Sequence, residues 1–187
     1  MEWVEVRRQI FHLANGTIIL VAMKHYGKPV GWIIIALSLI GACLSWYHSK
    51  VKPFKWAEPF LLALEREENM NLPGKGAVLY GLSVGITILL FKPLPAQCGI
   101  AALAYGDAFS TIIGKSFGRR SIPWNPKLSV EGSTAFVAAT TCLGTLFVPL
   151  PYSFSAGVIG AFAETIPGID DNLSIPLLTA LIMSMVS

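Results

Sequence analysis

Apolar segments alternate with shorter polar segments along the whole chain. Seven apolar segments can be drawn, and each is close to the ~20 residues that a helix needs to cross a bilayer. They cover residues 9–26, 29–47, 75–92, 94–113, 131–150, 152–168 and 172–187. Because lipid cannot satisfy open backbone hydrogen-bonding groups, we expect these segments to be helical. The pattern predicts an all-α fold, a polytopic membrane helical bundle of about seven transmembrane helices that forms a single domain over residues 1–187.

The composition also favours an integral membrane protein. Of the 187 residues, 53% are hydrophobic and 13% are charged, whereas a soluble domain averages about 25% charged residues. The net charge of +3 does not indicate a nucleic-acid partner, because the cations are divided among the polar segments and form no basic patch. We therefore expect the lipid bilayer, and no nucleic acid, among the partners of this chain.

The lysines and arginines predict how the bundle is oriented. With a cytosolic N-terminus, the crossings place eleven of these cations on the cytosolic side and three on the outer side, a strong positive-inside bias. The cytosolic cations are Arg7, Arg8, Lys50, Lys52, Lys55, Arg66, Lys75, Lys115, Arg119, Arg120 and Lys127, and the outer ones are Lys24, Lys28 and Lys92. This orientation brings the 114–130 loop and the Asp170-Asp171 loop to the same, cytosolic face of the cell membrane.

Residues 50–74 form the longest polar stretch. Apolar residues gather in its first half and charges in its second, which fits an amphipathic helix at the membrane interface with Trp56 at headgroup level. A solvated connector is an equally good interpretation of the acidic residues. Lys75 follows at the cytosolic start of the third apolar segment, where it is a candidate for contact with a substrate.

The fourth apolar segment contains a carboxylate, Asp107. Ionisable side chains inside membrane segments are costly and usually functional, and a buried structural aspartate would need a partner. Gly106 precedes it, and Gly114 and Gly118 follow with the spacing of a helix-packing motif. Glycine backbone beside cations also suits a polyphosphate, and a carboxylate suits the metal that accompanies one. The segment therefore predicts a nucleotide site at the cytosolic rim.

Cations fill the loop between Asp107 and the next carboxylate, Glu131. They are Lys115, Arg119, Arg120 and Lys127. Prolines in this loop argue against a helix. Cytosolic loops are commonly basic, so it is the position between two carboxylates that makes these cations candidate phosphate ligands.

Two more groups of polar residues lie toward the cytosolic side. Arg8 and His12 share a helix face, where they either anchor and pack the helix or line a substrate cavity. Glu164 precedes the adjacent pair Asp170-Asp171 by about two helical turns. Asp171 or Asn172 is the expected N-cap of the last helix, and because capping needs only one residue, the aspartates can also hold a divalent metal.

Familiar soluble motifs are absent from the sequence. Gly114-Lys115-Ser116 resembles the end of a P-loop, but that motif requires glycine where the chain has Phe109. The scattered histidines and cysteines match no zinc pattern, and there is no Gly-x-Ser-x-Gly nucleophile elbow. The clustered aspartates of a CDP-alcohol phosphotransferase are missing too.

Taken together, these segments resemble the membrane-bound polyprenol kinases, which comprise dolichol kinase, phytol kinase and CTP-dependent diacylglycerol kinase. The resemblance runs nearly end to end, and the set of stretches in this order is more specific than any one of them. The stretches are Arg7-Arg8-x-x-x-His12, Arg66-Glu67 before Pro73-Gly74-Lys75-Gly76, Tyr105-Gly106-Asp107-Ala108 with Gly114-Lys115-x-Phe117-Gly118, Lys127-x-Ser129-x-Glu131-Gly132-Ser133, and Glu164 followed by Asp170-Asp171-Asn172-Leu173-x-Ile175-Pro176.

The resemblance implies a CTP-dependent kinase that phosphorylates the hydroxyl of a membrane lipid alcohol, of polyprenol, dolichol, phytol or diacylglycerol type, and releases CDP. The implied ligands of Mg²⁺ on the triphosphate are Asp107, Asp170 and Asp171. The catalytic candidates are Asp107, Glu131 and Lys127, with either carboxylate as acceptor of the hydroxyl proton. The candidates for nucleotide binding are Gly106, Gly114, Lys115, Gly118, Arg119, Arg120, Ser129, Gly132 and Asn172. The candidates for the substrate pocket are Arg8, His12, Lys75 and Glu164.

Two other functions are compatible with the sequence. A cytidylyltransferase would form a CDP-activated lipid and release pyrophosphate. A small membrane transporter would use intramembrane acids as an ion path and would spread them through the depth of the membrane, whereas the acids here gather toward one face.

Overall fold

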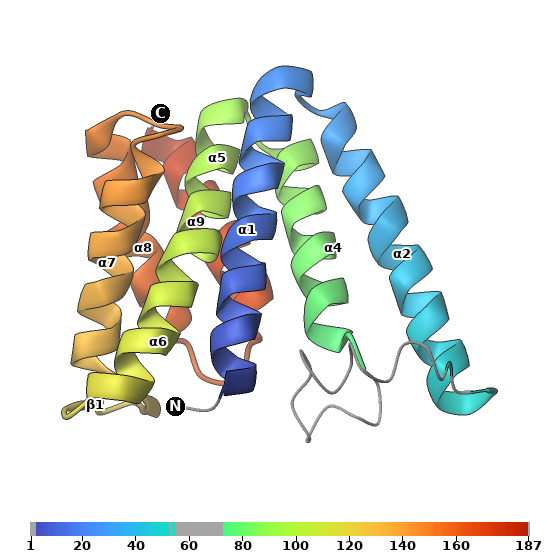
Figure 1. Ribbon diagram of the computed structural model, residues 1–187. Coiled ribbons are helices and arrows are strands. Elements are labelled where there is room, and N and C mark those ends of the chain that lie inside the picture. Colours follow the sequence, from blue (N-terminus) through green and yellow to red (C-terminus); the bar gives the residue numbers. More distant parts are fainter. Residues whose placement is uncertain (1–2, 53, 55–72, 187) are drawn as a thin grey trace.

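The computed structural model describes residues 3–52, 54 and 73–186. This part of the chain is almost entirely helical (Figure 1). The helices are α1 (Trp3–Tyr26), α2 (Pro29–Lys50), α4 (Lys75–Leu90), α5 (Pro93–Ala101), η2 (Ala102–Asp107), α6 (Ala108–Phe117), α7 (Val130–Gly144), α8 (Leu150–Glu164) and α9 (Asp171–Val186), where η2 is a π-helical segment. Because α5, η2 and α6 follow one another without a break, the described residues form seven helical rods. The predicted seven-helix bundle is confirmed.

Prolines mark the start of three helices. Pro29, Pro93 and Pro151 lie in the first or second position of α2, α5 and α8. The fixed φ of proline suits the first turn of a helix, and its missing N–H costs no hydrogen bond there. These helix starts are therefore set locally by the sequence.

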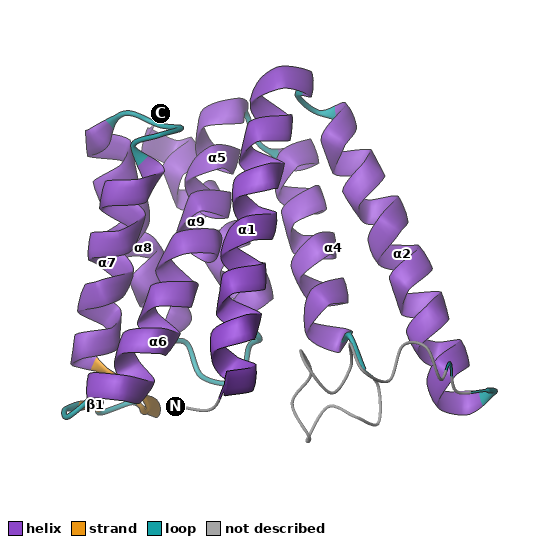
Figure 2. Cartoon of the chain, in the orientation of Figure 1, coloured by secondary structure: helices purple, strands orange, loops and turns teal. Residues whose placement is uncertain are grey.

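The polypeptide after the fourth rod differs from the expected irregular loop. α6 continues to Phe117, and a two-stranded antiparallel sheet follows, formed by β1 (Ser121–Ile122) and β2 (Asn125–Ser129). Prolines exclude a helix here, as predicted, but they lie in the turn and on an edge strand, where a missing N–H is tolerated. The fold is all-α with one small β hairpin (Figure 2).

The π segment η2 lies in the centre of the bundle. It packs against α1, α7, α8 and α9, and its residues from Ala102 to Gly106 are buried. Apolar side chains such as Leu20, Phe136 and Ile175 form the core around it. Small residues allow the close approach of these rods, because a Cβ on Gly106 would collide with the Phe136 ring.

Four segments meet at one end of the bundle. Figure 1 shows the start of α1, the start of α4, the β hairpin and the connection from α8 to α9 at the same end, which we call the site end. The prediction that the 114–130 loop and the Asp170-Asp171 loop share one side is thus confirmed. The interfacial helix predicted at 50–74 falls almost entirely outside the described residues.

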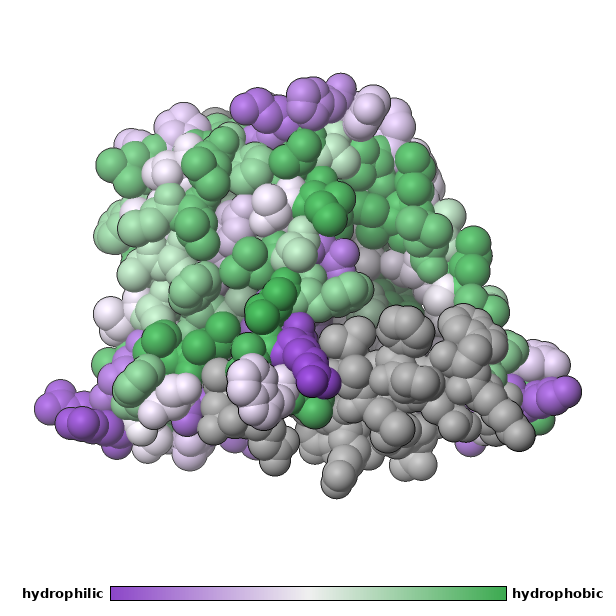
Figure 3. All heavy atoms as spheres, in the orientation of Figure 1, coloured by the Kyte–Doolittle hydropathy of each residue, from purple (hydrophilic) through white to green (hydrophobic). Residues whose placement is uncertain are grey.

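Hydropathy sets α2 apart from the other described helices. Its 22 residues are long and apolar enough for a complete bilayer crossing, while α4 and α9 are apolar but shorter. α2 packs along α4 at the edge of the bundle and exposes Trp32, Ile33 and Ile40. Apolar residues also cover the middle of the visible face, with hydrophilic residues at both ends (Figure 3). Membrane crossing by the other rods stays a prediction.

A methyl group at Gly99 is expected to destabilise the bundle. In Gly99→Ala the added Cβ would collide with the backbone carbonyl of Pro176 in α9, which cannot turn aside as the end of a side chain can. Overpacking of this kind costs about 1–3 kcal/mol. We expect a lower thermal unfolding midpoint in detergent.

The matched control is Gly76→Ala in α4, whose Cβ meets nothing within 4 Å. Alanine has the higher helix propensity, so this variant should unfold at the wild-type temperature or above it. Equal midpoints for the two variants would contradict the close contact between α5 and α9.

Candidate functional site

His12 connects the N-terminal helix to the π segment. Its Nε2 lies 3.2 Å from the carbonyl oxygen of Leu103 and 3.5 Å from Oδ2 of Asp107. A π segment shifts the backbone hydrogen bonds to i→i+5 and is frequent at functional sites. The Tyr80 ring of α4 meets the His12 ring edge-on, with 4.5 Å between the ring centroids. One imidazole nitrogen thus faces both a carbonyl and a carboxylate of η2.

Glu164, at the end of α8, is a buried carboxylate. Only 2% of the residue is exposed, and its Oε1 accepts a 2.6 Å hydrogen bond from the Ser110 hydroxyl of α6. Its other oxygen, Oε2, has no hydrogen-bond partner among the described residues. Asp107 and Asp171 both lie close enough to repel its negative charge. Glu164 therefore links the acidic residues of η2 and α9.

Asp170 caps the last helix. Its Oδ1 accepts hydrogen bonds from the backbone N–H of Asn172 at 3.1 Å and from the Asn172 side-chain amide at 2.9 Å. Because α9 begins at Asp171, the N-cap is Asp170, and the expectation that Asp171 or Asn172 caps the helix is wrong. Asp170 is exposed, whereas Asp171 is half-buried and lies near Glu164.

The carboxylates match the donor chemistry of Mg²⁺ without forming a closed cage. No three histidine, cysteine, aspartate or glutamate side chains converge as a metal site within the described ranges. Mg²⁺ is commonly held by one or two carboxylates together with substrate phosphates. The unsatisfied Oε2 of Glu164, near Asp107 and Asp171, is an oxygen that such an ion would satisfy. A metal on Asp107, Asp170 and Asp171 stays a prediction, and Glu164 is more central than Asp170.

Lys115 of α6 is held by Glu5, a carboxylate that the sequence analysis did not single out. The Lys115 Nζ lies 2.6 Å from Oε2 of Glu5, and Oε1 of Glu5 accepts 3.1 Å hydrogen bonds from Arg8 and Gln9. Glu5 is buried and Lys115 is about half exposed. The ion pair therefore ties the first turn of α1 to the last turn of α6.

Glu131 and Ser129 organise the β hairpin. Oε2 of Glu131 accepts hydrogen bonds from the backbone N–H groups of Arg119 at 3.1 Å and Arg120 at 3.3 Å. Ser129 is the N-cap of α7 and accepts a 3.1 Å hydrogen bond from the N–H of Gly132. Glu131 is thus bound by the backbone just before the hairpin, whereas Asp107 lies against His12 of α1 and near Glu164 of α8.

The glycines predicted to bind nucleotide lie in tight contacts between backbone segments. A Cβ on Gly118 would collide with the carbonyl of Gly114, and one on Gly132 would lie 3.0 Å from the Ser110 carbonyl. A Cβ on Gly114 would lie 3.3 Å from the Ser129 hydroxyl. These contacts favour the packing interpretation of Gly114-x-x-x-Gly118, and a phosphate role for the glycines stays a prediction.

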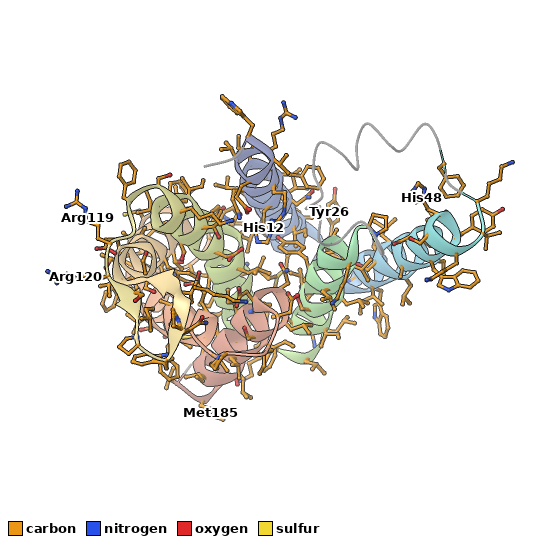
Figure 4. All side chains as sticks on the ribbon, turned by 90° about the horizontal axis from the view of Figure 1, so that it is seen from below. His12, Tyr26, His48, Arg119, Arg120 and Met185 are labelled. Carbon is orange, nitrogen blue, oxygen red and sulfur yellow. The ribbon has the colours of Figure 1, made fainter. Side chains whose placement is uncertain are left out.

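The other predicted cations lie on the surface. Arg119 and Arg120 point away from the bundle at its edge, whereas His12 lies inside it, as the view from the site end shows (Figure 4). Lys127 on β2 and Lys75 at the start of α4 are also exposed. Their exposure makes them accessible to an anion that approaches the site end from solution.

A cavity of about 590 Å³ lies between α1, α2 and α4, and we call it the α1–α2–α4 groove. Its apolar lining includes Phe11, Ile19, Ile34 and Leu37. Its polar lining includes Arg8, His12, Asn15, Tyr80 and Asn172. Arg8 and His12 therefore line a cavity, while Lys75 and Glu164 do not line this one, and a substrate role for all four residues stays a prediction.

Three site residues were missed or undervalued from the sequence. Glu5 precedes Arg8 and Gln9 by three and four residues, and this helical spacing was the signal that could have identified it. Ser110 lies one helical turn after Asp107, but nothing in the sequence connects it to Glu164. Tyr80 was not among the residues singled out from the sequence, and its ring contact with His12 could not be predicted.

Relatives match most of the chain. Phytol kinase of Synechocystis sp. is 26% identical over 193 residues, which cover 95% of this chain and 78% of the relative. An uncharacterized protein of Methanocaldococcus jannaschii is 30% identical over 184 residues, with coverage of 96% and 93%. CTP-dependent diacylglycerol kinase 1 of Schizosaccharomyces pombe is 29% identical over 142 residues, with coverage of 66% and 65%. No protein-family profile matches the chain, and no solved structure does.

The relatives named as kinases place this helical bundle among the lipid kinases. The resemblance inferred from the sequence motifs is confirmed. The chain belongs to the polyprenol kinase family.

The contact between Glu5 and Lys115 is expected to stabilise the docking of α1 on α6. Glu5→Gln and Lys115→Met should each lower the free energy of unfolding, and the double variant should lose less than the sum of the two. We expect a coupling of about 1 kcal/mol, because water screens the half-exposed lysine. The measurement is a double-mutant cycle by chemical or thermal unfolding.

Lys75→Met provides the control for loss of a cation at the same end of the bundle. Lys75 is exposed, so its removal should leave stability nearly unchanged and should show no coupling to Glu5→Gln. Additive effects of Glu5→Gln and Lys115→Met would show that the ion pair does not hold α1 in place.

Proposed function

We propose that this protein is a CTP-dependent kinase of the cell membrane, which transfers the γ-phosphoryl group of CTP to the hydroxyl of a membrane lipid alcohol and releases CDP. The observation that carries the proposal is the position of Glu164 within electrostatic range of Asp107 and Asp171, with Asp107 also in contact with the groove residue His12. A lipid kinase needs a polar site for its nucleotide next to an apolar site for its lipid. The names of a phytol kinase and a CTP-dependent diacylglycerol kinase among the relatives support the same reaction.

The surface supports a bundle embedded in the bilayer with its site end in the cytosol. Large apolar side chains such as Ile18, Leu181 and Phe162 are exposed on different rods, and apolar residues cover the middle of the visible face (Figure 3). Soluble monomers rarely expose contiguous apolar patches of large area. Trp3 and Trp46 are exposed toward the site end, a position typical of headgroup anchors. The excess of cations at this end favours the cytosol.

The nucleotide would bind at the site end, with its triphosphate toward the acidic residues. Bound Mg²⁺ would supply positive charge on the triphosphate, and Glu164 and Asp171 are the ligands that we assign to it. The cations of α6 and the hairpin would neutralise the phosphates as charge develops on them. Among these, Lys115 is already fixed by Glu5, whereas Arg119 and Arg120 would have to turn inward.

Asp107 is the carboxylate that we assign to the hydroxyl of the lipid. It lies 3.5 Å from the ring of His12, which lines the groove, whereas Glu131 is engaged by the backbone of the hairpin. Phosphoryl transfer depends mainly on positioning and charge stabilisation, and acceptance of the hydroxyl proton by Asp107 would complete it. The sequence left Asp107 and Glu131 as alternative acceptors of the hydroxyl proton, and this assignment selects Asp107.

The reaction is tested with CTP labelled in its γ-phosphate, purified protein, Mg²⁺ and a panel of prenols and diacylglycerol. A kinase transfers the label to the lipid. Label in pyrophosphate would instead identify a cytidylyltransferase, and absence of any nucleotide turnover or binding would favour a transporter. Either of these results would refute the proposed kinase.

Asp107→Asn is expected to reduce phosphoryl transfer by a factor of at least about 100, because general-base catalysis contributes about 10²–10⁴. The protein should still fold and insert, since asparagine keeps the shape of the side chain. Asp170→Asn is the matched control, because asparagine is as good an N-cap as aspartate. The γ-label assay measures both variants, and full activity of Asp107→Asn or equal loss in Asp170→Asn would contradict the assigned roles.

Single cysteines are expected to report a cytosolic site end. In a variant with Cys43, Cys98 and Cys142 replaced by serine, a cysteine is placed at Trp124 in the hairpin or at Tyr26 at the opposite end. A membrane-impermeant maleimide applied to intact spheroplasts should label the Tyr26→Cys variant at once. It should label the Trp124→Cys variant only after lysis, and the reverse pattern would overturn the orientation.

A further inference from the structure

The charged group and the histidine that line the α1–α2–α4 groove lie toward the site end, and apolar side chains line its far end. α1 runs from the site end to the opposite end, so its lining residues Arg8 and His12 lie nearer the site end than Ile19 does (Figure 1). α2 runs in the opposite direction, which places Ile34, near its start, at the same far end of the groove as Ile19. Asn172, at the start of α9, adds a polar group at the site end. This gradient suits a molecule with a polar head and an apolar tail.

The groove also reaches the outer surface of the bundle. Phe11 of α1 and Leu37 of α2 line it and are 53% and 63% exposed. α2 packs mainly along α4 and touches α1 much less. A hydrocarbon chain in the bilayer can therefore enter sideways between α1 and α2 without leaving the apolar phase.

The volume of the groove limits the size of its occupant. The groove's 590 Å³ lies within the range of about 300–1,000 Å³ that is typical of pockets for ligands of drug-like size. A single hydrocarbon chain of diterpene length is a molecule of that size, whereas a diacylglycerol with two long acyl chains is considerably larger. Pockets of this size normally enclose most of their ligand.

We infer that the α1–α2–α4 groove binds the hydrocarbon chain of a single-chain lipid alcohol and selects it over two-chain alcohols. The hydroxyl then lies at the polar side of the groove, where the His12 ring touches Asp107. Arg8, next to His12 in the lining, is positioned to meet the phosphate that the alcohol receives. This inference rests on the proposed kinase activity for its choice of an alcohol, but the groove and its shape do not depend on that activity.

Two glycines in the lining allow the groove to be filled without disturbing the fold. A Cβ on Gly76 meets nothing within 4 Å, and one on Gly41 meets only Val78 at 3.9 Å. Gly41→Leu and Gly76→Leu therefore project a side chain into the groove, and leucine also raises helix propensity. Ala36→Leu is the matched control: it adds bulk at an exposed position of α2 that does not line the groove.

Binding is measured first by photolabelling of the purified protein in nanodiscs with a diazirine analogue of geranylgeraniol. The wild type and Ala36→Leu should be labelled equally on peptides of α1, α2 and α4. Gly41→Leu and Gly76→Leu should lose most of this labelling, with unchanged unfolding temperatures. Equal labelling of all four proteins, or labelling confined to other helices, would overturn the groove assignment.

Kinetics then test selection of the alcohol. One methylene in a hydrophobic pocket changes discrimination about tenfold or more, so both leucine variants should raise the KM for geranylgeraniol at least tenfold and leave the KM for CTP unchanged. The wild type should use geranylgeraniol with a kcat/KM at least about tenfold above that for 1,2-dioleoylglycerol. Equal use of the two alcohols would refute the selection of a single chain.

The two proposals fail in different ways. If no alcohol receives the γ-phosphate but photolabelling of the groove behaves as described, the kinase proposal is wrong and the lipid-binding groove stands. If alcohols are phosphorylated but neither leucine variant changes labelling or the KM for the alcohol, the kinase stands and the groove assignment is wrong.

Discussion

The electrostatic repulsion of the buried Glu164 carboxylate by two further carboxylates is the constraint on which the rest of the structure depends. Glu164 lies within repulsive range of Asp107 and Asp171, and like charges in a poorly solvated interior repel strongly. Ser110 satisfies one oxygen of Glu164, and the other has no hydrogen-bond partner in the described part of the chain. These carboxylates cost free energy unless a cation or a proton binds among them. The metal ion of a bound nucleotide would supply that positive charge.

The first helix contacts both the proposed nucleotide site and the proposed lipid groove. Near its start, Glu5 holds Lys115 on the side where the cations of α6 and the hairpin lie. Two turns later, His12 contacts the π segment on one side and lines the α1–α2–α4 groove on the other. A phosphoryl group passing from nucleotide to lipid would cross between these two places. η2 packs against both α1 and α8, so its carboxylate interacts with His12 on one side and with Glu164 on the other.

Hydrophobic patterning and cation counting predicted most of the fold, since they report local properties of each segment. The seven helical rods and the shared end of the two loops followed from the sequence. The β hairpin did not, because strands as short as Ser121–Ile122 carry no period. Gly114 and Gly118 remained ambiguous, as close packing and phosphate contact use the same residue at the same spacing. The pair of Glu5 and Lys115 joins residues 110 apart in sequence, so only the tertiary fold reveals it.

The most direct test of the acidic site is the thermal unfolding midpoint of the purified protein with Mg²⁺, with CTP, with both and with neither. A ligand at 100 times its Kd stabilises the folded state by about 2.7 kcal/mol. Mg²⁺ and CTP together should raise the midpoint more than either alone, and a variant carrying both Glu164→Gln and Asp171→Asn should lose that rise. An unchanged wild-type midpoint, or a full rise in the double variant, would contradict a nucleotide–metal site built on these carboxylates.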